Sequence, residues 1–109
     1  MLVIFLLIQA ITSYTRALSS HQDDPVLVNR GIVHSILRDT KLALADFDLA
    51  IELNPLSAPS YFNRGNLHYS LGDYSSAEQD YKKGNRLLTH WVKWHKRPPN
   101  FCVLLYIGF

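Results

Sequence analysis

The sequence predicts an all-α fold in which antiparallel helix hairpins stack as a repeat array. Two observations predict it. The segment 24–57 aligns with the segment 58–91 without a gap, at a shift of 34 residues, and in each segment apolar residues recur at helical spacing on both sides of a central turn. The aligned positions are Asn29-Arg30-Gly31 with Asn63-Arg64-Gly65, His34 with His68, Ala43 with Ala77, Asp46 with Asp80, and Phe47 with Tyr81.

The segment 1–23 comes first and holds half of such a unit. Ala10-Ile11, Tyr14 and Ala17-Leu18 repeat the pattern of Ala43-Leu44, Phe47 and Ala50-Ile51 at a shift of 33, which predicts the second helix of an incomplete repeat. The apolar run Met1–Ile8 is shorter than a bilayer span, which needs about 18 residues, and it has no preceding basic residue and no cleavage-site pattern. We therefore expect a helix packed on its neighbours in preference to a signal or membrane segment.

The repeat 24–57 is expected to form helices over Pro25–Leu37 and Leu42–Leu53. Proline suits the first turn because its missing N–H has no intrahelical partner there. The second helix stops at Asn54-Pro55, since a residue before proline is pushed away from helical angles.

The repeat 58–91 is expected to form helices over Pro59–Leu71 and Tyr74–Leu88, separated by the Gly72-Asp73 break. Small residues fall where the two helices of each hairpin must approach closely, namely Gly31 and Gly65 in the first helices and Ala43 and Ala77 in the second. Phe47 and Tyr81 are expected to fill the space beside them.

The segment 92–109 follows as a tail that is first basic and aromatic and then apolar. Such a composition suits a membrane surface, but Trp91 and Trp94 are also spaced to cover the end of the array on a continued helix. Cys102 is the only cysteine, so no internal disulfide is possible.

The two repeats resemble the tetratricopeptide repeat signature, which has a period of 34 residues. The residues that carry the resemblance are Gly31 and Gly65, Ala43 and Ala77, and Phe47 and Tyr81. The resemblance implies a right-handed α-solenoid of two full repeats plus one half repeat. Three departures stand out: Arg38 replaces the turn glycine, Gly84-Asn85 replaces Ala50-Ile51, and no proline follows Leu88. Hydrophobic termini in place of polar caps suggest a short product or fragment of a longer repeat protein.

Several function classes lack support in the sequence. A net charge of +2 argues against nucleic-acid binding. His34 and His68 are explained by duplication, and no Cys/His spacing suits a metal, so neither metal nor cofactor is expected. No strand-turn-helix elbow or phosphate loop is present, and the chain is therefore not expected to be an enzyme.

The resemblance implies a protein-interaction scaffold that binds a polypeptide segment in a groove lined by the first helices. A cytoplasmic location is expected because the fold, with its single cysteine, does not depend on an oxidising compartment. Two alternatives remain: a membrane-associated product anchored by its apolar termini, and a non-functional truncated or splice product of a longer scaffold. The resemblance places these residues in the groove: Asn29, Ile32, Ile36, Phe62, Asn63, Asn66 and Tyr69.

Overall fold

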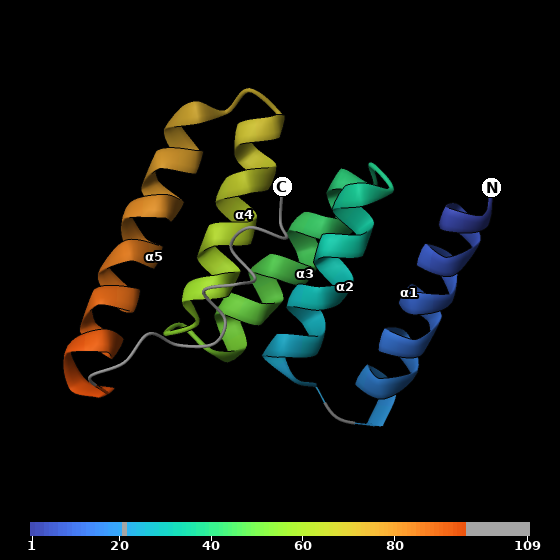
Figure 1. Cartoon of the computed structure of the whole chain (residues 1–109), viewed down its shortest axis with the longest axis horizontal. Helices are drawn as coiled ribbons and strands as arrows, with labels where there is room; N and C mark the ends of the chain where they lie inside the picture. Colours follow the sequence, from blue (N-terminus) through green and yellow to red (C-terminus); the bar gives the residue numbers. More distant parts are fainter. Residues whose placement is uncertain (21, 96–109) are drawn as a thin grey trace. The chain divides into compact units, whose positions relative to one another are not determined.

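The computed structural model describes residues 1–20 and 22–95, and this part of the chain contains helices and turns but no strand. The helices are α1 (Leu2–Ser20), α2 (Asp24–Ile36), α3 (Thr40–Leu53), α4 (Ala58–Ser70) and α5 (Tyr74–His95) (Figure 1). The predicted all-α class is therefore confirmed. The chain divides after Pro55 into two compact units, which are described in turn.

The helix boundaries lie close to those that the sequence predicts. α2, α3 and α4 each begin one or two residues before the predicted start, because the residues ahead of Pro25, Leu42 and Pro59 already have helical geometry. α5 differs more, since it continues without a break from Tyr74 to His95, beyond the expected end at Leu88. Gly84 and Asn85 thus do not end the helix, and no proline is present there to stop it.

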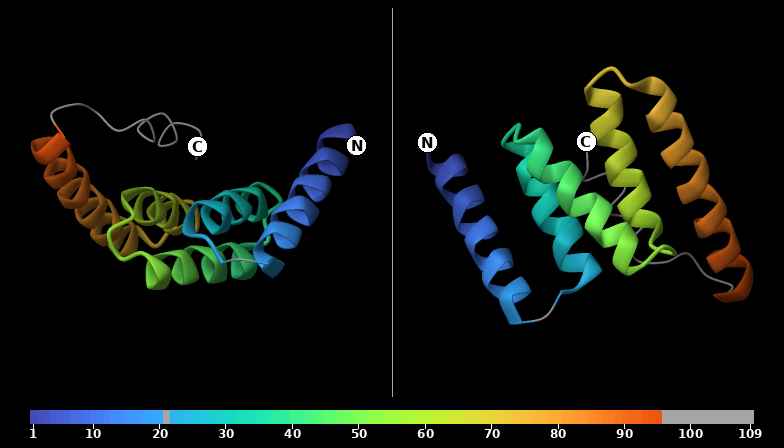
Figure 2. Two further views of the ribbon diagram at one scale, coloured as in Figure 1. Left: turned by 90° about the horizontal axis from the view of Figure 1, so that it is seen from below. Right: turned by 180° about the vertical axis from the view of Figure 1, so that it is seen from behind.

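In the first unit, α2 packs against α3 and α1 packs against α2 (Figures 1 and 2). Ala43 and Phe47 lie in the core of the α2–α3 hairpin, where they are 0% and 1% exposed. A Cβ atom added at Gly31 would lie 2.6 Å from Phe47 Cε1. Glycine is therefore required for the ring of Phe47 to reach the backbone of α2, as the sequence predicts.

In the second unit, α4 and α5 form the corresponding hairpin. Ala77 is 1% exposed, and a Cβ at Gly65 would lie 2.8 Å from Tyr81 Cε1. Gly84 has a partner of its own, because a Cβ there would lie 2.9 Å from Phe62 Cε2. At the equivalent positions the first unit has Val28 and Ala50, both buried. The departure from alanine at Gly84 thus accommodates a larger residue on α4.

The same turn closes both hairpins. The Asp39 N–H donates to the His34 carbonyl at 2.8 Å, and the Asp73 N–H donates to the His68 carbonyl at 2.9 Å. Both turns need one residue in the left-handed region, where Gly72 has φ 83° and Arg38 has φ 64°. The arginine is strained at this position because its Cβ crowds the following carbonyl, whereas glycine is not.

α1 is apolar on more sides than its contact with α2 uses. Leu7, Ala10, Ile11, Tyr14 and Leu18 form a half-buried stripe at helical spacing, whereas Ala17, which also belongs to the predicted half repeat, is exposed. The side chains of Leu2–Leu6 and Ile8 are each more than half exposed. The expectation that the run Met1–Ile8 packs onto its neighbours is therefore wrong for most of its side chains, since one neighbouring helix covers only one face. By length and composition the stretch Leu2–Ser19 is also apolar enough to cross a bilayer.

Candidate functional site

The residues predicted to line a binding groove lie on α2 and α4, the first helices of the two hairpins. Ile36 and Tyr69 are the most accessible, at 56% and 59% exposed. Asn29, Ile32, Phe62 and Asn66 are half-buried. Because α2 and α4 belong to different units, each face is a surface of its own hairpin. The α4 face is the richer in aromatic and amide groups.

Asn63 is the predicted site residue that is least available to a ligand. Its side chain is buried, at 4% exposed, and its Nδ2 donates to the Pro59 carbonyl at 2.8 Å. This bond occupies the first turn of α4, where proline has set the chain direction. The role visible in the fold is to hold the start of the helix.

Asn66 lies three residues further along α4 and connects it to α5. The Tyr81 hydroxyl donates to Asn66 Oδ1 at 2.7 Å. Burial raises the pKa of Tyr81, and the nearby Tyr69 and Asp80 add to the effect, so the donating neutral hydroxyl is favoured. Asn66 Nδ2 donates to no other group in the described part of the chain, which leaves two N–H groups at a half-buried position.

Tyr69 lies beside Asn66 on α4 and pairs with an aromatic residue that the sequence reasoning did not select. The rings of Tyr69 and Tyr74 meet edge to face, with their centroids 5.0 Å apart and their planes at 63°. Tyr74 is 61% exposed, although it begins α5 rather than lying on a first helix. The turn between Ser70 and Tyr74 brings the two rings together. The sequence could have indicated this pair, because only four residues separate Tyr69 from Tyr74 across the turn.

Phe62 points partly into its own hairpin. Its ring lies over Gly84, and its centroid is 6.4 Å from that of Tyr81. The side chain is half-buried, so only part of it is available to a partner. Its first role is to pack α4 on α5, and the exposed remainder lies on the same helix face as Asn66, four residues away.

A polar cluster centred on a nearly buried carboxylate repeats in both units. Arg64 donates from Nε and Nη2 to the two carboxylate oxygens of Asp80, at 2.9 and 2.7 Å, and His68 Nε2 is 3.8 Å from Asp80 Oδ2. Arg30, Asp46 and His34 repeat this arrangement in the first unit.

The pKa of Arg30 is raised, chiefly by its hydrogen bond to the Asp46 carboxylate. The sequence shows that the Arg, His and Asp positions of this cluster are repeated in both units. That their side chains pair with one another is seen only in the structure. Each cluster has one carboxylate, one guanidinium and one imidazole, and it joins the two helices of its hairpin.

Two observations on residues 1–20 and 22–95 concern metal ligands and buried polar groups. No group of three or more His, Cys, Asp or Glu side chains lies together in this part as a metal site would require. Every buried side-chain nitrogen and oxygen there has a hydrogen-bond partner. Paired polar groups of this kind stabilise helix packing.

Comparison with known proteins supports the repeat fold. Residues 58–84 match the tetratricopeptide repeat family. Tetratricopeptide repeat protein 6 of Homo sapiens is 38% identical over 57 residues, which is 52% of this chain and 11% of that protein. Protein SGT1 homolog of Bos taurus is 31% identical over 91 residues, which is 77% of this chain and 27% of the relative. The chain thus spans a minor part of these curated relatives.

Among solved structures, a tetratricopeptide repeat protein from Parabacteroides merdae has the same fold. The TM-score is 0.62 and the sequence identity 26%, and the alignment covers 94% of this chain and 49% of the other. The alignment therefore extends well beyond the single repeat at residues 58–84.

Proposed function

Because this chain belongs to the tetratricopeptide repeat family, we propose that it is an interaction adaptor that binds a polypeptide segment on the exposed face of α4. The match to tetratricopeptide repeats and the relatives that share them support a general role in protein interaction. We place the binding surface on α4 because of the side chains that the second unit exposes there. A cytoplasmic location remains part of the proposal.

The observation that carries the proposal is the pairing of unused donors with an exposed aromatic at Asn66 and Tyr69. The amide N–H groups of Asn66 can donate to a peptide carbonyl, while its oxygen is held by the Tyr81 hydroxyl. Tyr69 provides a rigid ring that is 59% exposed and braced by Tyr74. Tyrosine is enriched among the residues that dominate binding energy at interfaces.

The α2 face provides the apolar counterpart in the first unit. Ile36 is 56% exposed and Ile32 is half-buried one turn before it. An aliphatic surface of this size supports weak, nonspecific contact, and it has no braced aromatic pair. We therefore place the specific contact on α4 and treat Asn29, Ile32 and Ile36 as secondary.

Site-specific photo-crosslinking tests the proposal. A benzophenone side chain at position 69 should capture a polypeptide from cytosolic extract, whereas the same group at position 82 should not, because Lys82 is 69% exposed and lies on the charged surface of α5. Equal capture at both positions would show that the α4 face has no preference for a partner.

Substitution separates the surface amide from the hairpin bond. Asn66→Ala and Tyr81→Phe both remove the hydrogen bond between these residues, but only Asn66→Ala removes the amide from the surface. We expect Asn66→Ala with Tyr69→Ala to weaken partner binding by about 2–4 kcal/mol, and Tyr81→Phe to leave it nearly unchanged. If Tyr81→Phe weakens binding equally, the bond acts through hairpin stability and the amide is not a contact.

A further inference from the structure

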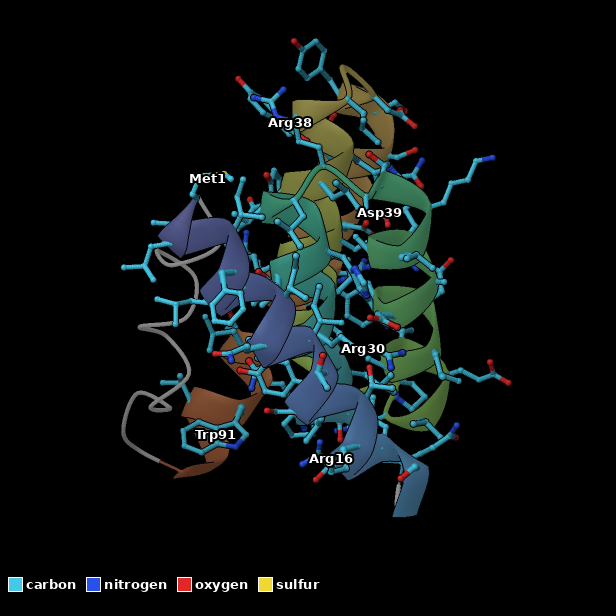
Figure 3. All side chains as sticks on the ribbon, turned by 90° about the vertical axis from the view of Figure 1, so that its right-hand side faces the viewer. Met1, Arg16, Arg30, Arg38, Asp39 and Trp91 are labelled. Carbon is cyan, nitrogen blue, oxygen red and sulfur yellow. The ribbon has the colours of Figure 1, made fainter. Side chains whose placement is uncertain are left out.

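The first two turns of α1 have an apolar surface on all sides. Met1–Ile8 contains no polar side chain, and the first charged side chain of α1 is Arg16; Figure 3 marks Met1 and Arg16 toward opposite ends of the helix. Successive residues are 100° apart around a helix, so Leu2 and Ile4 lie on nearly opposite faces. They are 70% and 52% exposed. A helix that packs on a protein partner needs only one apolar stripe.

The other half of α1 differs. Gln9, Thr12 and Arg16 are exposed there, while Ile11, Tyr14 and Leu18 continue the half-buried stripe. Arg30 Nη1 of α2 donates to Thr15 Oγ1 at 3.3 Å, which ties this half to the hairpin. The helix is thus amphipathic where it is docked and apolar all round where it is not.

From this division we propose that Met1–Ile8 inserts into one leaflet of a lipid bilayer while the rest of α1 stays docked on α2. The acyl chains of a bilayer can cover every face of a helix at once, and Met1–Ile8 brings no charged side chain into contact with them; its one charge is the α-amino group of Met1. Eight helical residues are about 12 Å long, which is less than half of the roughly 30 Å hydrocarbon core.

The segment Leu2–Ser19 is long enough to cross the bilayer completely. A complete crossing would separate the half-buried stripe of α1 from α2 and break the hydrogen bond between Arg30 and Thr15. Partial insertion leaves that interface intact. The proposed lipid contact is independent of the α4 face, and either can fail without the other.

Vesicle flotation of the full chain tests the proposal with phosphatidylcholine vesicles, which carry no net charge. The wild type should float with the vesicles. Two double variants address opposite faces, Leu2→Gln with Leu6→Gln, and Ile4→Gln with Ile8→Gln. Each pair removes two exposed apolar side chains, so each should weaken partitioning by about tenfold or more. Glutamine is neutral and a good helix former, and the helical circular dichroism should be unchanged.

The matched control is Leu42→Gln with Leu71→Gln, because these side chains are 49% and 52% exposed but lie outside α1. It should float like the wild type. A wild type that stays with the soluble fraction would overturn the proposal. Loss of flotation in only one of the two α1 variants, together with a concentration-dependent dimer without lipid, would instead assign Met1–Ile8 to a contact between copies of the chain.

Discussion

Arg64 and Asp80 form a two-point ion pair between α4 and α5, and Arg30 and Asp46 repeat it between α2 and α3 with distances of 2.9 and 2.6 Å. The carboxylates are nearly buried, with side chains 7% and 6% exposed, whereas the arginines are 23% and 21% exposed. Each hairpin is therefore held by an oriented charged contact beside its apolar core.

Removing one partner of such a pair should destabilise its hairpin. Asp80→Asn leaves the Arg64 guanidinium without its two-point partner, and we expect a loss of about 1.5–3 kcal/mol, the range for hydrogen bonds that involve a charged group. Urea unfolding followed by circular dichroism measures it. Glu78→Gln serves as the control because the Lys82–Glu78 pair is exposed on both sides, and it should leave the midpoint unchanged. Equal effects of both substitutions would contradict a special role for the buried pair.

Arg38→Gly should stabilise the first hairpin. At φ 64° an L residue with a side chain pays a penalty of roughly 1–2 kcal/mol, and part of the gain from its removal is lost to the greater entropy of an unfolded glycine. We expect a net gain of about 0.5–1 kcal/mol in the free energy of unfolding.

The reverse change, Gly72→Ala, tests the same argument in the second unit. It should destabilise, although nothing lies within 4 Å of the added Cβ, because the strain is in the backbone at φ 83°. If neither substitution moves the unfolding midpoint, the two turns tolerate the left-handed conformation without cost.

Gly31→Ala should destabilise the first unit by about 1–3 kcal/mol, since it overfills the contact with a buried ring. The added Cβ would lie 2.6 Å from Phe47 Cε1, and Phe47 is only 1% exposed and cannot move aside. Combining Gly31→Ala with Phe47→Leu should recover part of the loss, which a double-mutant cycle in thermal unfolding would show. Strict additivity of the two changes would argue against direct contact.

Asp73 should contribute to stability in a pH-dependent way. The Ser76 side chain and then the Ser76 N–H donate to its carboxylate at the start of α5, and these bonds lower the pKa of Asp73 from 3.8. A lowered folded-state pKa gives stability that is present above the unfolded pKa and lost as the pH falls through the folded value.

The wild type should therefore be more stable than Asp73→Ala at pH 7, and the difference should shrink below about pH 4. Asp39→Ala is the comparison, because Asp39 precedes α3 without a side-chain cap bond. A difference of the same size at pH 7 and pH 2.5, or an equal effect of Asp39→Ala, would exclude a capping carboxylate.

The repeat period could be read from the sequence because the fold is built from local hairpins. Helices of about thirteen residues, small residues at Gly31 and Gly65, and rings at Phe47 and Tyr81 all follow from spacing along one helix and across one turn. The continuation of α5 beyond Leu88 to His95 was not predicted, because it depends on packing and no residue between Leu88 and His95 signals it.

The candidate site was less accessible to sequence reasoning. Helical spacing placed Asn63, Asn66 and Tyr69 on the first helix of the repeat, but it could not tell that Asn63 is bonded to Pro59 or that Tyr74 braces Tyr69. These contacts depend on side-chain rotamers and on the conformation of the turn between α4 and α5. Neither of these can be read from the spacing of residues in the sequence.

The sequence by itself thus determined the all-α class, the register of the two hairpins and the close contacts at their small residues, because periodic burial is encoded locally. Only the tertiary structure decided which polar groups pair and which apolar groups stay uncovered. Asp80 is buried against Arg64 while Leu2 is 70% exposed, although composition alone would predict the opposite. The reason is geometric: a side chain is buried only if another helix lies over it, and a charged one is tolerated there only when its partner meets it.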